Sequence, residues 1–138
     1  MPRLRWILLS MTTVLCLLSL SCGKGGQQPN LHDRILAANV SKFCRLPDAC
    51  FNPHVLAIDD GYFVTTFIGS KPEHERVPAK GLAKYLQALP VQAWPRGPSI
   101  TISPSDVVLD PRAVEQNFNA AQQLCRSLGL EVQVQPGG

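Results

Sequence analysis

The fold is decided by residues 99–135, which read SITISPSDVVLDPRAVEQNFNAAQQLCRSLGLEVQVQ. Residues 99–103 alternate apolar and polar side chains as a strand does, and Asp110 followed by Pro111 is typical of a helix start. Apolar residues then recur at helical spacing, and this stripe comprises Val114, Phe118, Ala121, Cys125 and Leu128. Gly129 is predicted to end the helix, and residues 131–135 alternate as a final strand. The stretch predicts a strand–helix–strand unit whose two parallel strands are neighbours or leave room for one strand between them.

Two shorter helices are predicted earlier in the chain. Asn30 is a suitable cap for a helix over residues 31–43, whose apolar face is formed by Leu36, Val40 and Phe43. Pro78 suits the first position of a helix over residues 78–89, whose inward stripe comprises Leu82, Tyr85, Leu86 and Leu89. Pro90 should end that second helix, because the residue before a proline disfavours the helical conformation.

A strand hairpin separates these two helices. Residues 54–58 and 62–68 are rich in β-branched and aromatic side chains, as strands are. Asp60-Gly61 is predicted as the two-residue turn between them, because glycine adopts a positive φ freely and aspartate tolerates one. Residues 69–76 are polar and contain Pro72, so they are predicted to be a loop.

The resulting element order is α-β-β-α-β-α-β. It predicts an α/β (α+β) fold class, a small two-layer sandwich in which helices cover one face of a four-stranded mixed sheet. Residues 31–138 should form this single globular domain. The alternation in the last strand requires the other face of the sheet to be polar and solvated, or covered by a partner.

The first 21 residues are typical of a signal peptide. They hold Arg3 and Arg5, no acidic residue, and an apolar run over residues 6–20 that is short for a membrane span. The sequence around Cys22 resembles the lipobox of bacterial lipoproteins, although the family's Leu at −3 and small residue at −2 appear here in swapped order. We therefore expect lipidation of Cys22, with a flexible Gly/Gln-rich tether over residues 22–30. Ordinary cleavage after Ser21 and a retained membrane helix are the alternatives.

Composition narrows the possible partners. The chain of 138 residues has 13 Lys plus Arg against 10 Asp plus Glu, and two of the basic residues belong to the first 21 positions. The remainder carries 11 basic and 10 acidic side chains, so it is close to neutral. This balance argues against a nucleic-acid partner and against a polybasic membrane-binding surface.

The remaining cysteines suggest one disulfide in an oxidising compartment. Cys44 and Cys50 flank a short segment with a Pro-Asp turn and are expected to pair. The helical stripe assigns Cys125 to the core, as a free thiol or paired with Cys22 if that residue is not lipidated. No metal site is expected, because His32, His54 and His74 stand far apart and none pairs with a cysteine at ligand spacing.

No residue of the chain is expected to be catalytic. Asp59 and Asp60 are interpreted as turn formers, and residues 73–76 as a solvated charged segment. Ser103 lacks the flanking glycines of a nucleophile elbow. Trp94 lies among prolines and is the candidate binding residue, because an aromatic side chain held on a surface costs little entropy to present; the alternative is that it folds back over the core.

The succession of elements over residues 54–135 also resembles a known family. The elements are a hairpin turning at Asp60-Gly61, a helix over 82–89, a strand at 100–102 and a long helix ending at 128–130. Their order is similar to that of the periplasmic domain of the ExbD/TolR family. The resemblance implies an accessory subunit of a proton-driven motor rather than an enzyme. The family's membrane helix carries an Asp for proton passage, whereas residues 1–22 hold no acidic residue, so neither motor coupling nor any functional residue is carried over.

The sequence predicts an exported bacterial envelope protein that faces the periplasm and is held to a membrane by a lipid. Its domain is expected to bind an envelope protein or peptidoglycan without catalysis and without a cofactor, as an accessory to a transport or motor complex. Two other classes of function stay open. One is a periplasmic enzyme or thiol-redox protein that uses Cys44 and Cys50, and the other is a carrier of a small ligand.

Overall fold

The computed structural model describes residues 29–38, 40–44, 50–69 and 71–137 as one α+β unit. The expected signal peptide, the lipidation site Cys22 and nearly all of the expected tether lie outside these residues. No helix within the described part of the chain is long and apolar enough to span a membrane.

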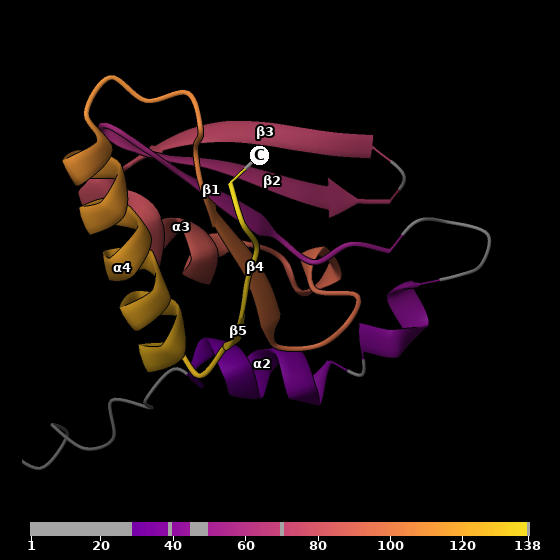
Figure 1. The fold of residues 1–138 in the computed structure, drawn as a ribbon. Helices are drawn as coiled ribbons and strands as arrows, with labels where there is room; N and C mark the ends of the chain where they lie inside the picture. The colour runs from indigo at the N-terminus through magenta and orange to yellow at the C-terminus, as the bar shows by residue number, and fades with distance from the viewer. Residues whose placement is uncertain (1–28, 39, 45–49, 70, 138) are drawn as a thin grey trace, which may run out of the picture.

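A five-stranded mixed sheet forms the centre of the molecule (Figure 1). Its strand order is β3-β2-β1-β4-β5. The strands are β1 (His54–Ile58), β2 (Gly61–Ile68), β3 (Lys71–Pro78), β4 (Ser99–Pro104) and β5 (Glu131–Val134). The first three pair antiparallel, whereas β1 with β4 and β4 with β5 pair parallel. The predicted parallel strand pair is confirmed, with its two strands as direct neighbours.

The fifth strand corrects the four-stranded sheet expected from the sequence. Residues 69–76 are not a loop: β3 covers Lys71–Pro78 and pairs with the whole length of β2. Only Val77 of β3 is buried, so the strand shows no apolar alternation. It lies at the edge of the sheet, where charged side chains and Pro72 are tolerated and discourage pairing with a second chain.

The turn between β1 and β2 is shifted by one residue from the prediction. Ile58 pairs with Gly61, so the two central residues are Asp59 and Asp60 rather than Asp60 and Gly61. Gly61 is the first residue of β2 and has a φ of 151°. A Cβ atom at this position would lie 2.4 Å from the Val77 carbonyl oxygen of the neighbouring strand. The glycine is therefore required by close packing of β3 and not by the turn itself.

The helices α3 (Leu82–Ala88) and α4 (Pro111–Ser127) cover one face of the sheet. In Figure 1 they lie beside each other, while α2 (Leu31–Ala37) runs across the lower end of the molecule. The Tyr62 hydroxyl donates a hydrogen bond to the Asn117 carbonyl oxygen of α4 at 3.0 Å. Tyr62 shares its side of the sheet with Val55 and Ile102, which are buried in the core. The opposite face carries His54, Thr101 and Gln133, which are in register with one another.

The long helix confirms its prediction closely. Asp110 caps it by accepting hydrogen bonds from the backbone of Arg112 and Ala113, and Gly129 follows it with a φ of 78°. The stripe points inward: Val114, Ala121 and Cys125 are buried, and Phe118 and Leu128 pack against the core.

The two shorter helices differ from their predicted bounds. Asn30 caps the first as expected, but α2 ends at Ala37 and a 3₁₀ helix follows over Val40–Phe43. The buried residues of α2 are Leu31 and Ile35, whereas Leu36 is exposed, so the predicted apolar face was wrong. The helix predicted over residues 78–89 begins later, as α3 at Leu82. Residues up to Pro78 belong to β3, and a 3₁₀ turn over Ala79–Gly81 follows them. The predicted inward stripe of this helix is confirmed by burial of Leu82, Leu86 and Leu89.

Candidate functional site

Trp94 is fully buried, so its side chain folds back over the core and does not lie on the surface. A 3₁₀ helix over Val91–Ala93 turns the chain inward, and the backbone N–H of Trp94 donates to the Val91 carbonyl oxygen at 3.1 Å. The indole Nε1 has no hydrogen-bond partner within the described chain. The proline-rich segment packs inward because the large indole ring buries more apolar area than any other side chain in it. Trp94 is therefore a core residue in this structure and not a surface for recognition.

The Cys44–Cys50 pairing is confirmed, with a Cα–Cα distance of 5.6 Å. Cys125 is a free thiol among the described cysteines and is completely buried. Burial raises the pKa of Cys125 to about 12, so the thiol stays protonated at neutral pH and is a poor nucleophile. The burial of Cys125 agrees with its predicted place in the core. The alternative pairing of Cys125 with Cys22 stays a prediction, because Cys22 lies outside the described residues.

A cleft of about 380 Å³ opens on the face of the sheet that the helices leave uncovered. It spans the parallel strands β1, β4 and β5. Its lining is polar except for one aromatic ring, and the side chains that face it include Phe51, Arg96, Thr101, Gln133 and Gln135. The sequence predicted that this face of the sheet is polar, and the cleft lies on it over β1, β4 and β5.

Asn52 shapes one wall of the cleft. Its amide nitrogen donates to the carbonyl oxygens of Gly97 and Ser99 at 2.9 and 2.7 Å, and its side-chain oxygen accepts from the backbone N–H of Arg96 at 2.9 Å. These bonds tie the segment before β1 to the start of β4. The Asn52 side chain thus holds the backbone of Arg96 at the rim of the cleft. The Arg96 side chain itself is exposed.

His54 lines the cleft and forms a pair with the buried Ser103 that the sequence did not reveal. His54 Nε2 and Ser103 Oγ are hydrogen-bonded at 2.6 Å, one from β1 and one from the neighbouring strand β4. Burial lowers the pKa of His54 below its ordinary value, so the imidazole is neutral at neutral pH. Ser103 is itself buried, and within the described chain no carboxylate is bonded to His54. The pair lacks the orienting acid and the accessible hydroxyl of a nucleophilic triad and fits a structural role.

The remaining polar side chains of the cleft are available to a ligand. Arg96, Thr101 and Gln133 make no side-chain hydrogen bond within the described chain. The ring of Phe51 is about half exposed and packs against Phe67 with a centroid distance of 5.0 Å and an angle of 47° between the ring planes. One cation, several neutral donors and acceptors, and an aromatic wall suit a polar polymer that carries occasional negative charges.

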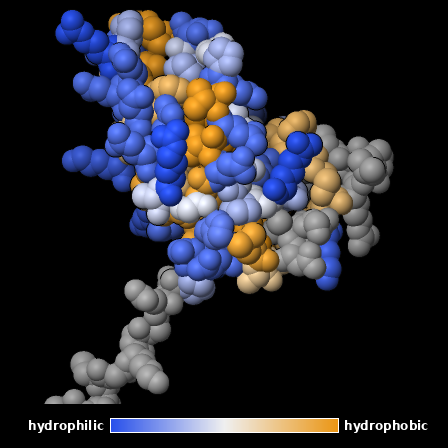
Figure 2. All heavy atoms as spheres, turned by 60° about the horizontal axis from the view of Figure 1, so that its bottom comes forward, coloured by the Kyte–Doolittle hydropathy of each residue, from blue (hydrophilic) through white to orange (hydrophobic). Residues whose placement is uncertain are grey.

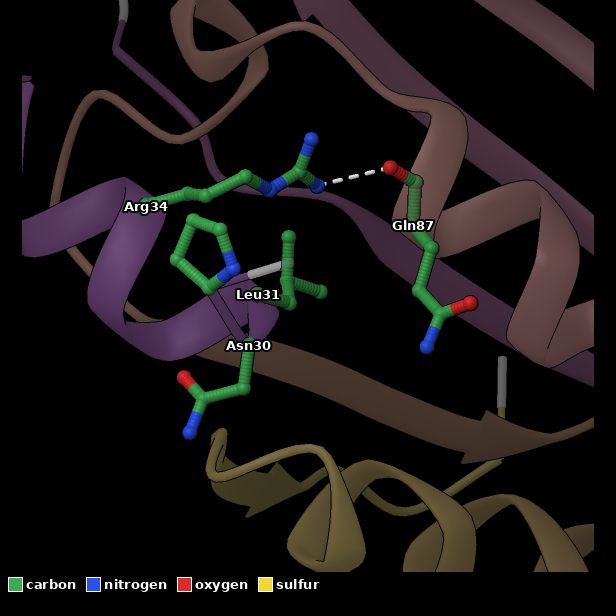
Figure 3. A pocket seen from close by; sticks show the side chains of 5 residues that line it. Asn30, Leu31, Arg34 and Gln87 are labelled. Atoms are coloured by element: carbon green, nitrogen blue, oxygen red, sulfur yellow. Dashed lines mark hydrogen bonds between the residues drawn. The ribbon is translucent and has the colours of Figure 1, made fainter. Parts of the chain in front are cut away.

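A second hollow, of about 490 Å³, lies between α2 and α3 (Figure 3). Figure 3 shows the Arg34 side chain reaching across it, where the guanidinium donates to the backbone carbonyl oxygen of Gln87 at 2.6 Å, while the Gln87 side chain points away from Arg34. Asn30 is engaged as the cap of α2. Arg34 and Asn30 are therefore engaged in attaching and capping α2, and the Gln87 side-chain amide is the one polar lining group without a hydrogen bond within the described chain.

Figure 2 shows the face of the molecule that lies at the bottom of Figure 1. Hydrophilic side chains cover most of it, with a narrow hydrophobic strip between them. No group of three or more His, Cys, Asp or Glu side chains that could hold a metal ion occurs among the described residues.

Comparison of the chain with protein-family models, with curated proteins and with solved structures found no match.

The sequence indicated that the outer face of the sheet is polar but not which residues meet there. His54, Thr101 and Gln133 are separated by tens of residues and are brought together only by the parallel register of β1, β4 and β5, while Asn52 places Arg96 beside them. Asn52 gave no recognisable pattern, since its role depends on backbone groups more than 40 positions away. The alternations over residues 99–103 and 131–135 were the signals in the sequence that marked the side chains of this face.

Proposed function

We propose that this chain is an exported, lipid-anchored protein of the bacterial cell envelope whose periplasm-facing domain binds another envelope component without catalysis. The cleft over β1, β4 and β5 is the observation that supports the proposal. Its free side chains are one guanidinium, one hydroxyl and two amides, and its histidine is neutral and engaged with a buried serine. Such a surface can bind a ligand but contains no activated nucleophile.

Peptidoglycan is the envelope component whose chemistry suits this cleft best. It is rich in hydroxyl and amide groups and carries carboxylates on its peptide stems. Arg96 can pair with a carboxylate, Thr101 and Gln133 can exchange hydrogen bonds with amides or hydroxyls, and the exposed part of Phe51 can stack on the apolar face of a sugar ring. The resemblance to the ExbD/TolR domain supports a place beside a transport or motor complex.

The cleft is tested by sedimentation of the full-length protein with purified peptidoglycan sacculi. We expect the double variant Arg96→Gln, Gln133→Ala to bind about tenfold or more weakly, because it loses one charge-assisted and one neutral hydrogen bond. Arg126→Gln is the matched control, since Arg126 is an exposed arginine on α4 that bonds only to Gln122. Equal sedimentation of the double variant and the wild type, or no sedimentation of the wild type, contradicts the proposed function.

The anchor is tested by cell fractionation. Cys22→Ala removes the thiol that would carry the lipid, so we expect the protein to move from the membrane fraction to the soluble fraction. Ser21→Ala keeps both the thiol and a small residue before it and should leave the protein in the membrane fraction. Unchanged fractionation of Cys22→Ala would mean that another part of the chain holds it to the membrane.

A further inference from the structure

The segment between β4 and α4, residues 105–110, exposes two large apolar side chains. Val107 is 89% exposed and Leu109 is 97% exposed, more than any other large hydrophobic residue of the described chain. Exposed apolar residues are common singly, but two of them beside an apolar groove indicate an interaction site. We call residues 105–110 the apolar loop.

The apolar loop is held in place by hydrogen bonds to its backbone. The carboxylate of Asp59 accepts from the backbone N–H of Asp110 at 2.8 Å and of Leu109 at 3.2 Å. The Ser105 hydroxyl accepts from the backbone N–H of Val107 at 3.2 Å. Asp59 is fixed in turn, because the Asn117 amide of α4 donates to the Ile58 carbonyl oxygen at 2.8 Å. A loop ordered before binding loses less entropy when a partner covers its side chains.

A groove of about 290 Å³ lies beside this loop. Its apolar wall comprises Pro104, Val108, Pro111, Val114 and Phe118. Glu115, in the first turns of α4, supplies a carboxylate at its edge. The groove can receive one or two apolar side chains of a partner, while Val107 and Leu109 can insert into the partner's own surface.

The charges around the loop are predominantly negative. The acidic residues of this end of the molecule are Asp59, Asp60, Asp106, Asp110 and Glu115. Arg76 is paired with Asp60, and the other basic residues close to this end in sequence or register are Lys80 and Arg112. A partner that covers the loop therefore gains from basic side chains placed beside its apolar ones.

We propose that the apolar loop and its groove form a docking surface for a protein segment that combines apolar side chains with flanking Lys or Arg residues. A membrane is the less favoured occupant, because the acidic residues around the loop would be repelled by anionic lipids. The loop also lies at the end of α4 opposite α2, as Figure 1 shows, and the 17 residues of α4 separate the two ends by about 25 Å.

This inference is independent of the proposed peptidoglycan cleft. The cleft lies over the outer side of β1, β4 and β5, whereas the groove is formed with α4, so the two sets of variants share no residue. Loss of sacculus binding leaves the docking surface untouched, and the reverse also holds.

The test is selection from a displayed library of random 12-residue peptides on the purified full-length protein. We expect the selected peptides to pair Leu, Phe or Trp with Lys or Arg, and a synthetic consensus peptide to bind more weakly as salt is raised. The double variant Val107→Ser, Leu109→Ser should bind this peptide about tenfold or more weakly. Its matched control is Leu36→Ser, Ile68→Ser, since these residues are 57% and 40% exposed and lie on α2 and at the far end of β2, so their loss should not change binding.

Several outcomes would overturn the docking surface. They are selection of no peptide, selection of peptides without basic residues, and equal binding of the consensus peptide to the loop variant. Binding to vesicles of anionic lipid that is lost in the loop variant would replace the protein partner with a membrane. Self-association of the wild type that is lost in the loop variant would replace it with a second copy of this chain.

Discussion

Replacing Gly61 with alanine is expected to lower the free energy of unfolding by roughly 3–4 kcal/mol. The new Cβ atom would lie 2.4 Å from the Val77 carbonyl oxygen and 3.0 Å from the Ala79 backbone nitrogen. Both neighbours are backbone atoms, so the clash cannot be relieved by rotating a side chain. The φ of 151° adds conformational strain, because L-amino acids rarely adopt it. Edge strand β3 would have to move away from β2 at its Pro78 end.

Gly69→Ala is the matched control for this measurement. Gly69 also has a positive φ, of 75°, but a Cβ atom there would meet nothing within 4 Å. Its substitution should cost only the strain of the left-handed conformation, about 1–2 kcal/mol. Urea unfolding followed by circular dichroism measures both variants. An equal loss of stability in the two would show that conformation alone, and not the close approach of β3, requires glycine at position 61.

The parts of the fold that could be predicted are those in which local chemistry and burial agree. Residues 110–129 carry a cap, an initial proline, an unbroken apolar stripe and a terminal glycine, and α4 has these bounds within two residues. Strands β1, β2 and β4 were likewise recognised by their apolar and β-branched residues. Each of these signals arises within a few residues of the chain, so no knowledge of distant contacts was needed.

The errors occurred where distant contacts decide the structure. Strand β3 is charged along most of its length and is held by its backbone pairing with β2, which leaves no pattern in its side chains. The one-residue shift of the turn follows from the approach of Val77 to Gly61, a contact across the hairpin that cannot be seen locally. In α2, Ile35 is buried instead of Leu36 because packing chose a different face of a short helix.

The same reasoning applies to the functional surfaces. Asp59 was correctly interpreted as a turn residue, but the sequence could not show that its carboxylate holds Leu109 and Asp110, fifty positions later. The Cys44–Cys50 pair was predictable because only five residues separate the two cysteines. The cleft needed the register of three parallel strands, and the exposure of Val107 and Leu109 needed the conformation of the apolar loop.

Trp94→Ala is expected to lower the free energy of unfolding by about 3–5 kcal/mol. The indole is fully buried in the core cluster, so its removal leaves a large cavity beneath the segment that joins α3 to β4. The two backbone hydrogen bonds of Trp94, to Val91 and from Gly97, do not depend on the side chain and should persist. The loss measured by urea unfolding therefore reports the packing of the ring.

Trp94→Phe separates the packing of the ring from its polar atom. The indole Nε1 has no hydrogen-bond partner within the described chain, and an unpaired buried donor is destabilising. Phenylalanine removes that donor while it keeps most of the apolar volume, so we expect this variant to stay within about 1.5 kcal/mol of the wild type. Near wild-type stability of Trp94→Ala, combined with weaker binding to sacculi or to the selected peptide, would instead restore Trp94 as a surface residue for recognition. A loss for Trp94→Phe as large as that for Trp94→Ala would mean that Nε1 has a partner, such as a buried water molecule.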